Sequence, residues 1–259
     1  MRKLSILLSG IFILTACNSG KENAMVMSDL TTENLKGDIS SYEETPYKTD
    51  STGKMGDMDS CCISVSEYDE NGNAAKNTSR DSKGVIKTES VITRHPNGAF
   101  KSATNTEKGK TTSSFETKVD EKGNYNWAQA LDSNGKLDVY YTEIKQNGDG
   151  MVTGWKEFDK DSVFRQSGES KYDKNMQTGF TLKDSLGKVK QTSISKFNDK
   201  GEQIENSNTT ITKDSTTTKI TKYTYEAHDE TGNWTQRTTW DDKGKATAIA
   251  KRTYTYRKK

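Results

Sequence analysis

The stretch from Asp120 to Gly135 reads DEKGNYNWAQALDSNG and sets out the organisation of the whole chain. Two four-residue units, each opening with Asp and closing with Gly, flank the segment 124–131. Asp suits the first position of a tight turn because its side chain can accept hydrogen bonds from backbone amides ahead of it, and Gly at the fourth position can take a positive φ. The stretch therefore predicts a strand between two hairpin turns.

The same four-residue unit recurs along the chain in steps of 11 to 14 residues. Pro96, in a variant copy, stands at the second turn position, which favours proline. An EF-hand calcium loop is the alternative, but the Glu expected at its twelfth position is missing. Full copies begin at Asp50, Asp69, Asp81, Asp120, Asp132, Asp184, Asp229 and Asp241, variants at His95 and Asn198, and degenerate copies at Asp159, Asp173 and Asp214.

The composition limits what these strands can build. Only 29% of the 259 residues are apolar, against roughly 45–50% in a typical globular domain, so a thick two-layer core is not expected. The net charge of only +2 argues against disorder, and the mixing of 39 basic with 37 acidic residues argues against a nucleic-acid partner. We predict an all-β fold, an extended antiparallel β-meander of repeated hairpins in an open, largely single-layer twisted sheet. A sheet whose ends curl around a thin aromatic core is the alternative.

The first residues have the features of an export signal. Arg2 and Lys3 precede an apolar run from Leu4 to Leu14, which has the length of a signal-peptide core and is too short to span a bilayer. The run ends in Leu14-Thr15-Ala16-Cys17, which resembles the lipobox of bacterial lipoproteins. That resemblance implies a lipid-anchored protein, modified at Cys17 and held at the outer membrane. The predicted divisions are a signal peptide (1–16), a lipidated Cys with a polar tether (17–33), and a β-meander domain (34–259).

Two motifs within the predicted β-meander domain resemble a known repeat family. Tyr68-Asp69-Glu70-Asn71-Gly72-Asn73 resembles the YD-repeat core of the Rhs family. The segment 229–240 and the segment from Leu35 through Tyr47 resemble the last repeats and the opening strand of small Rhs/YD-repeat lipoproteins. The resemblance implies an extended β-meander without established enzymatic activity, and the chain is too short for the shell that large Rhs proteins build around a toxin.

Exposed aromatic residues and short Asp-Ser motifs supply the candidate site residues. The candidate binding aromatics are Trp127, Trp155, Trp234 and Trp240, since Trp is enriched at interfaces and could stack on sugar rings, although they could instead form the thin core. Four triplets resemble an O-glycosylation acceptor of some bacteria, and their candidate serines are Ser51, Ser162, Ser185 and Ser215.

The remaining chemistry-bearing residues indicate no catalytic centre. Cys61 and Cys62 are adjacent, and we expect two part-buried thiols, with a vicinal disulfide or an intermolecular bridge as alternatives. No cysteine spacing suits zinc, and only His95 and His228 could serve a nucleophile, so we expect no metal site and no cofactor.

These observations favour a cell-envelope lipoprotein that presents a β-sheet surface to a protein or glycan ligand and performs no catalysis. One alternative is an immunity or accessory partner of a secreted toxin system, suggested by the Rhs-like repeats. Another is a glycan-active enzyme, because carboxylate pairs could occur among the 37 acidic residues.

Overall fold

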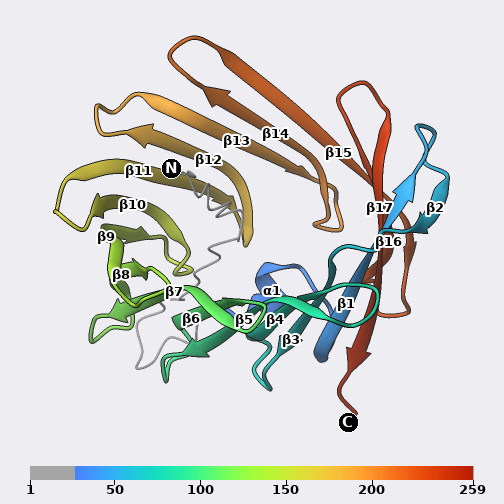
Figure 1. Cartoon of the computed structure of the whole chain (residues 1–259), viewed down its shortest axis with the longest axis horizontal. Helices are drawn as coiled ribbons and strands as arrows, with labels where there is room; N and C mark the ends of the chain where they lie inside the picture. The colour runs from blue at the N-terminus through green and yellow to red at the C-terminus, as the bar shows by residue number, and fades with distance from the viewer. Residues whose placement is uncertain (1–26, 259) are drawn as a thin grey trace.

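A computed structural model describes residues 27–258; the predicted signal peptide and Cys17 lie outside the described residues. The described chain is almost entirely β-structure, which confirms the all-β prediction (Figure 1). A short helix, α1 (Asp29–Thr32), is followed by the strands β1 (Ile39–Thr49), β2 (Met55–Met58), β3 (Ile63–Tyr68), β4 (Ala74–Arg80), β5 (Ile86–Arg94), β6 (Phe100–Glu107), β7 (Lys110–Val119), β8 (Tyr125–Leu131), β9 (Leu137–Gln146), β10 (Val152–Asp159), β11 (Phe164–Asp173), β12 (Met176–Asp184), β13 (Val189–Phe197), β14 (Gln203–Ile211), β15 (Thr216–His228), β16 (Trp234–Trp240) and β17 (Ala246–Tyr256).

The sheet closes into a barrel, so the predicted open, largely single-layer sheet is wrong. From β3 to β17 each strand pairs with the next in antiparallel fashion, and β1 pairs with β3 on one side and β17 on the other. Sixteen strands, β1 and β3–β17, thus form a ring, while β2 pairs with β1 beside it. Closure gives both end strands of the meander a hydrogen-bonded partner, which removes the exposed edges that an open sheet would leave.

All full copies of the repeated turn form as the sequence predicts, whereas the degenerate copies at Asp173 and Asp214 do not. In the copy at Asp120, the side-chain Oδ1 accepts the backbone N–H of Lys122 at 2.9 Å and of Asn124 at 2.8 Å, and Gly123 has a φ of 83°. Ten other described turns repeat both hydrogen bonds, with Asn in place of Asp at Asn147 and Asn198. The Asp oxygens therefore fix the backbone of the hairpins.

The helix α1 identifies the inner face of the barrel. It lies within the ring of strands in Figure 1, and Tyr68 and Tyr42 pack in the cluster that includes its Leu30. Residues paired across an antiparallel ladder point to one face, and neighbours along a strand point to opposite faces. Counting from Tyr42 and Tyr68 through the observed registers assigns an inner and an outer side chain to each strand of the ring.

Candidate functional site

The segment around α1 crosses one end of the barrel. Leu30 donates its backbone N–H to Gly72 in the β3–β4 turn at 3.0 Å, and Asn175 in the β11–β12 turn donates its side-chain amide to Thr31 O at 2.5 Å. These two turns lie half the ring apart. The Asn34 side chain also reaches Lys200 O at 2.7 Å in the β13–β14 turn. The segment therefore ties opposite walls together and covers this end, which we call the α1 end.

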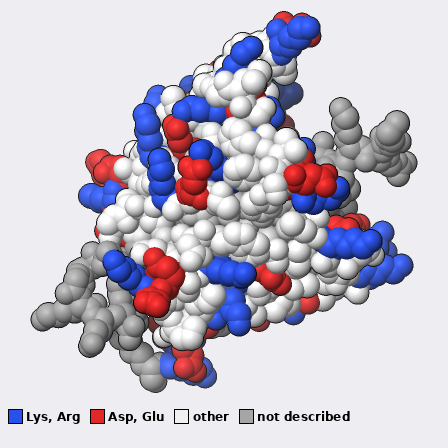
Figure 2. All heavy atoms as spheres, turned by 90° about the vertical axis from the view of Figure 1, so that its left-hand side faces the viewer, with Lys and Arg blue, Asp and Glu red and all other residues white. Residues whose placement is uncertain are grey.

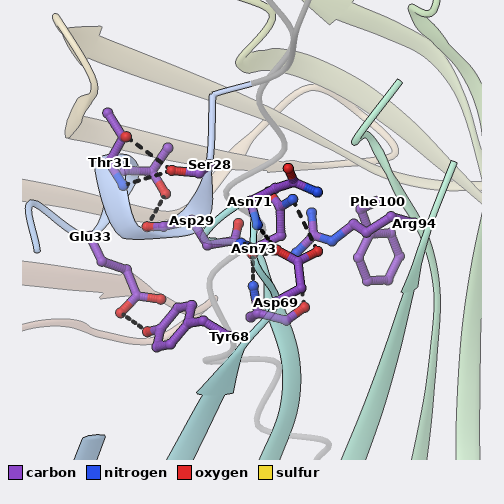
Figure 3. Close-up of polar contacts among 12 residues, drawn as sticks. Ser28, Asp29, Thr31, Glu33, Tyr68, Asp69, Asn71, Asn73, Arg94 and Phe100 are labelled. Carbon is purple, nitrogen blue, oxygen red and sulfur yellow. Dashed lines mark hydrogen bonds and ion pairs between the residues drawn. The ribbon is translucent and has the colours of Figure 1, made fainter. Parts of the chain in front are cut away.

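An ion pair fixes α1 to the inner wall (Figure 3). Arg94 on β5 donates to the Asp29 carboxylate, which also accepts the backbone N–H of Ala74 at 2.7 Å. The Arg94 guanidinium lies 5.9 Å from the ring centroid of Phe100. Burial raises the pKa of Asp29, while the charge of Arg94 acts in the opposite direction. Both side chains are largely enclosed, at 12% and 16% exposure, so the charges depend on each other.

Glu33, just after α1, faces the lumen of the barrel. Tyr68 donates its hydroxyl to Glu33 Oε2 at 3.0 Å (Figure 3). The surrounding protein raises the pKa of Glu33 to about 7, although the residue keeps an exposed surface. Enclosure and the neighbouring Glu33 charge raise the pKa of Tyr68. Because Glu33 keeps an exposed surface, water reaches this carboxyl group.

The opposite end of the lumen is more open. Inner-face side chains near that end are exposed, and they lie on strands from two sides of the ring. They are Thr88, Glu107, Thr210, Thr217 and Lys219. A sixteen-stranded barrel is also wide enough to leave an aqueous channel. Solvent therefore reaches these inner-face side chains at the end away from α1.

Two aromatic clusters line this lumen. On β16 and β17, Trp234 is 8% exposed and packs against the guanidinium of Arg252, which lies 4.1 Å from its ring centroid. On β9 and β10, Trp155 meets Tyr141 edge-on at a centroid distance of 5.4 Å. Glu157 accepts the Tyr141 hydrogen bond and is 8% exposed. The inner wall therefore combines aromatic faces with charged and hydrogen-bonding groups.

The four predicted binding tryptophans do not form one platform. Trp155 and Trp234 face the lumen from different walls. Trp127 faces outward, where Lys118 Nζ lies 4.5 Å from its ring centroid. Trp240 also faces outward, donates Nε1 to Thr224 at 2.9 Å and packs beside Gly53 of the β1–β2 turn. Only the two inner tryptophans remain candidates for a lumen site.

The candidate glycosylation serines share one end of the barrel. Ser51, Ser162, Ser185 and Ser215 are all exposed and stand in turns at the end opposite α1, because successive turns of a meander alternate between its ends. The sequence itself marks this alternation. The second turn residue is Glu in the copies at Asp69, Asp120 and Asp229 at the α1 end, and Ser in those at Asp50, Asp81, Asp132 and Asp184 at the other end.

A disulfide joins Cys61 and Cys62 in an exposed loop before β3, so the expected pair of part-buried free thiols is wrong. Cys62 has a φ of 75°, a left-handed conformation that an ordinary strand does not supply. His228 pairs with Glu202 at 2.5 Å, and His95 lies 3.3 Å from the Thr117 hydroxyl. Within residues 27–258, no cluster of three or more His, Cys, Asp or Glu could hold a metal ion.

An outward aromatic ladder does not follow from simple alternation, because β-bulges shift the alternation near the turns. Tyr140 and Phe158 stack at a centroid distance of 5.4 Å, and Phe158 lies 5.5 Å from Phe164. The register shifts between Glu157 and Phe158, where Arg165 on β11 has no paired residue, so Phe164 joins the outer face. Counting from sequence alone could not place that shift. This ladder is half-buried and is flanked by the charged outer wall.

No family model matches the chain, and no curated protein matches it. Among solved structures, it is similar to a porin-like protein from Bacteroides uniformis ATCC 8492, with 11% identity, coverage of 84% of this chain and 98% of that chain, and a TM-score of 0.52. A porin-like protein from Bacteroides vulgatus ATCC 8482 is 13% identical over the same coverages with a TM-score of 0.35, and a chain of TcdB2-TccC3-Cdc42 is 12% identical with 73% and 12% coverage and a TM-score of 0.30. The first likeness supports the barrel fold; the other two are too distant to carry an argument.

Proposed function

We propose that this chain is a non-enzymatic binding protein of the bacterial envelope, anchored by lipid at Cys17 to the outer membrane, whose barrel lumen holds a glycan. The observation that best supports this proposal is the set of side chains on the inner wall. On one side, Trp155 and Tyr141 keep half-buried rings on which a sugar could stack. On the other side, Arg252 and Glu44 supply charged hydrogen-bonding groups beside Trp234, which is 8% exposed. Tyr and Trp combine an apolar face with a polar group, which suits a ligand having both kinds of surface.

The outer wall favours a lipid anchor over a membrane-spanning barrel. It carries cross-strand ion pairs, including Lys183–Glu169 at 2.7 Å, Lys76–Glu89 at 2.7 Å and Lys196–Glu205 at 2.8 Å. Figure 2 shows basic and acidic side chains interspersed over the face that it displays. A Lys or Arg on a lipid-facing strand costs about 2–4 kcal/mol at the bilayer midplane. No helix within the described residues is long and apolar enough to cross a membrane.

The inner wall supports binding better than catalysis. Glu44 on β1 and Glu157 on β10 stand on strands half the ring apart, whereas glycosidases place their two carboxyl groups within about 10 Å. Asp29 and Glu33 are closer together on the α1 segment, but their carboxylates are engaged by Arg94 and Tyr68. A depression beside the β9–β10 turn, lined by Asn124, Ile144, Gln146, Asn147 and Gly148, has no ionisable side chain. No observation within the described residues favours the alternative of a partner in a secreted toxin system.

A matched pair of tryptophan variants tests the lumen site. The full-length lipoprotein, purified in detergent, is applied to a glycan array, and the best-bound glycan is titrated by calorimetry. Trp155→Ala removes an inner aromatic face, and Trp127→Ala removes an outer one. We expect Trp155→Ala to weaken binding at least about tenfold, within the ~1–3 kcal/mol range of an aromatic stacking contact, and Trp127→Ala to leave it unchanged. Absence of glycan binding, or equal effects of the two variants, would contradict the proposal.

The anchor has a separate test. Cys17→Ser removes the acceptor sulfur, so the protein should move from the membrane fraction to the soluble fraction. The intact mass of the wild type should exceed the mass of the polypeptide from residue 17 to residue 259 by the mass of the attached lipid. Membrane retention of Cys17→Ser would contradict the lipid anchor. An intact mass equal to polypeptide plus lipid would exclude glycosylation at Ser51, Ser162, Ser185 and Ser215.

A further inference from the structure

Two arginines share one carboxylate on the inner wall. Arg252 on β17 donates Nε to Glu44 Oε2 at 2.7 Å. Arg237 on β16 reaches the same carboxylate only at 3.8 Å, from Nη2 to Oε1. The side chain of Arg252 is 14% exposed, that of Arg237 is 23% exposed and that of Glu44 is 24% exposed. The two arginines therefore share the Glu44 carboxylate, and Arg252 makes the shorter contact.

Aromatic rings cover the faces of these guanidinium groups and leave their edges uncovered. The Arg237 guanidinium carbon lies 4.7 Å from the ring centroid of Trp234 and 5.0 Å from that of Tyr223. Such contacts orient the guanidinium plane, but its N–H donors point from the edges and require acceptors. Arg237 Nε is buried and has no hydrogen-bond partner in the described part of the chain, so a ligand would have to meet the Nη edge of this group. Tyr225 also hydrogen-bonds with this side chain. Arg237 is thus oriented and incompletely paired.

A second acid, Glu33, also lies near this corner, and its charge interacts with Arg252. Along β15 the inner positions around this corner are Lys219, Thr221, Tyr223 and Tyr225, and along β17 they include Ala248, Ala250 and Tyr254. Glu202, near the base of β14, is already paired with His228 at 2.5 Å. Lys219 is exposed toward the more open end. Glu107 is also exposed at that end, so a ligand entering there meets charges of both signs before it reaches Arg237.

We propose that Arg237 binds the acidic group of the lumen ligand, which is an acidic saccharide carrying a carboxylate on its ring. This inference rests on the proposed function and names the class of glycan. A guanidinium presents a planar pair of donors that matches a carboxylate, and the pairing is strongest where water is partly excluded. Glu44 holds Arg252 in place, so Arg237 is the group left to meet the ligand.

Calorimetry with two probes tests the class of ligand. The full-length lipoprotein is titrated with a trisaccharide of hexuronic acid and with the neutral hexose trisaccharide of the same linkage. We expect the acidic probe to bind at least tenfold more tightly, with a preference that falls as salt is raised. Arg237→Gln should abolish the preference, whereas Lys183→Gln, which removes a positive charge from the outer wall, should keep it.

The outcomes separate the two proposals. Equal binding of both probes, weakened by Trp155→Ala, would overturn the acidic class and leave the lumen glycan site standing. Binding of neither probe, together with a blank glycan array, would overturn both. If Arg237→Gln does not fold, Arg237→Lys keeps the charge and loses the planar donor pair, and it should reduce the preference several-fold; an unchanged preference in Arg237→Lys would overturn the role of Arg237.

Discussion

The inner and outer walls of this barrel use the same residue types for different purposes. On the outer wall, Lys183 and Glu169 form an exposed ion pair, and Trp127 lies under Lys118. On the inner wall, charges are enclosed and rings cover them, as with Arg94 and Asp29. In a barrel with few apolar residues, the inner wall therefore supplies the enclosed polar groups that can stabilise the fold or hold a ligand, whereas the outer wall leaves its ion pairs in water.

The largest contrast is expected between an inner and an outer ion pair. Arg94→Leu leaves the Asp29 carboxylate enclosed without its partner, which should lower the free energy of unfolding by about 3 kcal/mol. Lys183→Leu breaks the outer pair with Glu169, and an exposed pair is worth at most about 1 kcal/mol. Urea unfolding followed by circular dichroism measures both. Similar losses for the two variants would remove the distinction between the walls.

Two strand glycines give a contrast of opposite sign. A Cβ on Gly168, on the inner face, would press into the Trp155 ring, with Nε1 at 2.7 Å, so Gly168→Ala should destabilise the barrel by about 1–3 kcal/mol. A Cβ on Gly179, on the outer face, meets Lys171 Cβ at 3.6 Å, an ordinary contact. Gly179→Ala should therefore be neutral or stabilising by up to about 1 kcal/mol. Thermal unfolding of both variants checks the order, and a stabilising Gly168→Ala would contradict the inner packing.

The free energy of unfolding should depend on pH through the titration of Glu33. Its pKa rises from 4.5 to about 7 in the folded barrel, so the folded state holds the proton more tightly than the unfolded state. The stabilisation is complete below pH 4.5 and is lost as pH rises to about 7. Glu33→Gln keeps an acceptor for the Tyr68 hydroxyl and does not titrate. The stability of the wild type relative to Glu33→Gln should fall across this window, and a constant difference would show that Glu33 titrates normally.

The local structure was predictable from the sequence because it depends on neighbouring residues. Asp120 and Gly123 fix their turn through contacts within five residues, and Ser28 accepts the Thr31 N–H at 3.4 Å as the N-cap of α1. Closure was not predictable in this way. It depends on β1 meeting β17, for example Tyr42 opposite Tyr254, and no local pattern encodes a pairing across the whole chain.

The sequence also did not reveal which side chains point into the barrel and which point outward. Register is weakly specified when both faces of a strand are polar, and Thr, Ser, Asn and Lys occur on both walls here. Bulges beside the turns add a further shift: Val119 pairs with Tyr125, but Lys118 pairs with Trp127. Simple alternation therefore could not separate Trp127 from Trp155. The resemblance to YD repeats remains a prediction.

Hydroxyl-radical footprinting of the full-length lipoprotein, with and without its best-bound saccharide, most directly tests the claim that the inner wall is the binding surface. Mass spectrometry reads the oxidation of each aromatic residue. The saccharide should protect Trp155 and Tyr223, which face the lumen, and leave Trp127 and Tyr140 on the outer wall oxidised as before. Protection of Trp127 and Tyr140 with unchanged oxidation of Trp155 and Tyr223 would place the ligand outside the barrel and contradict the account.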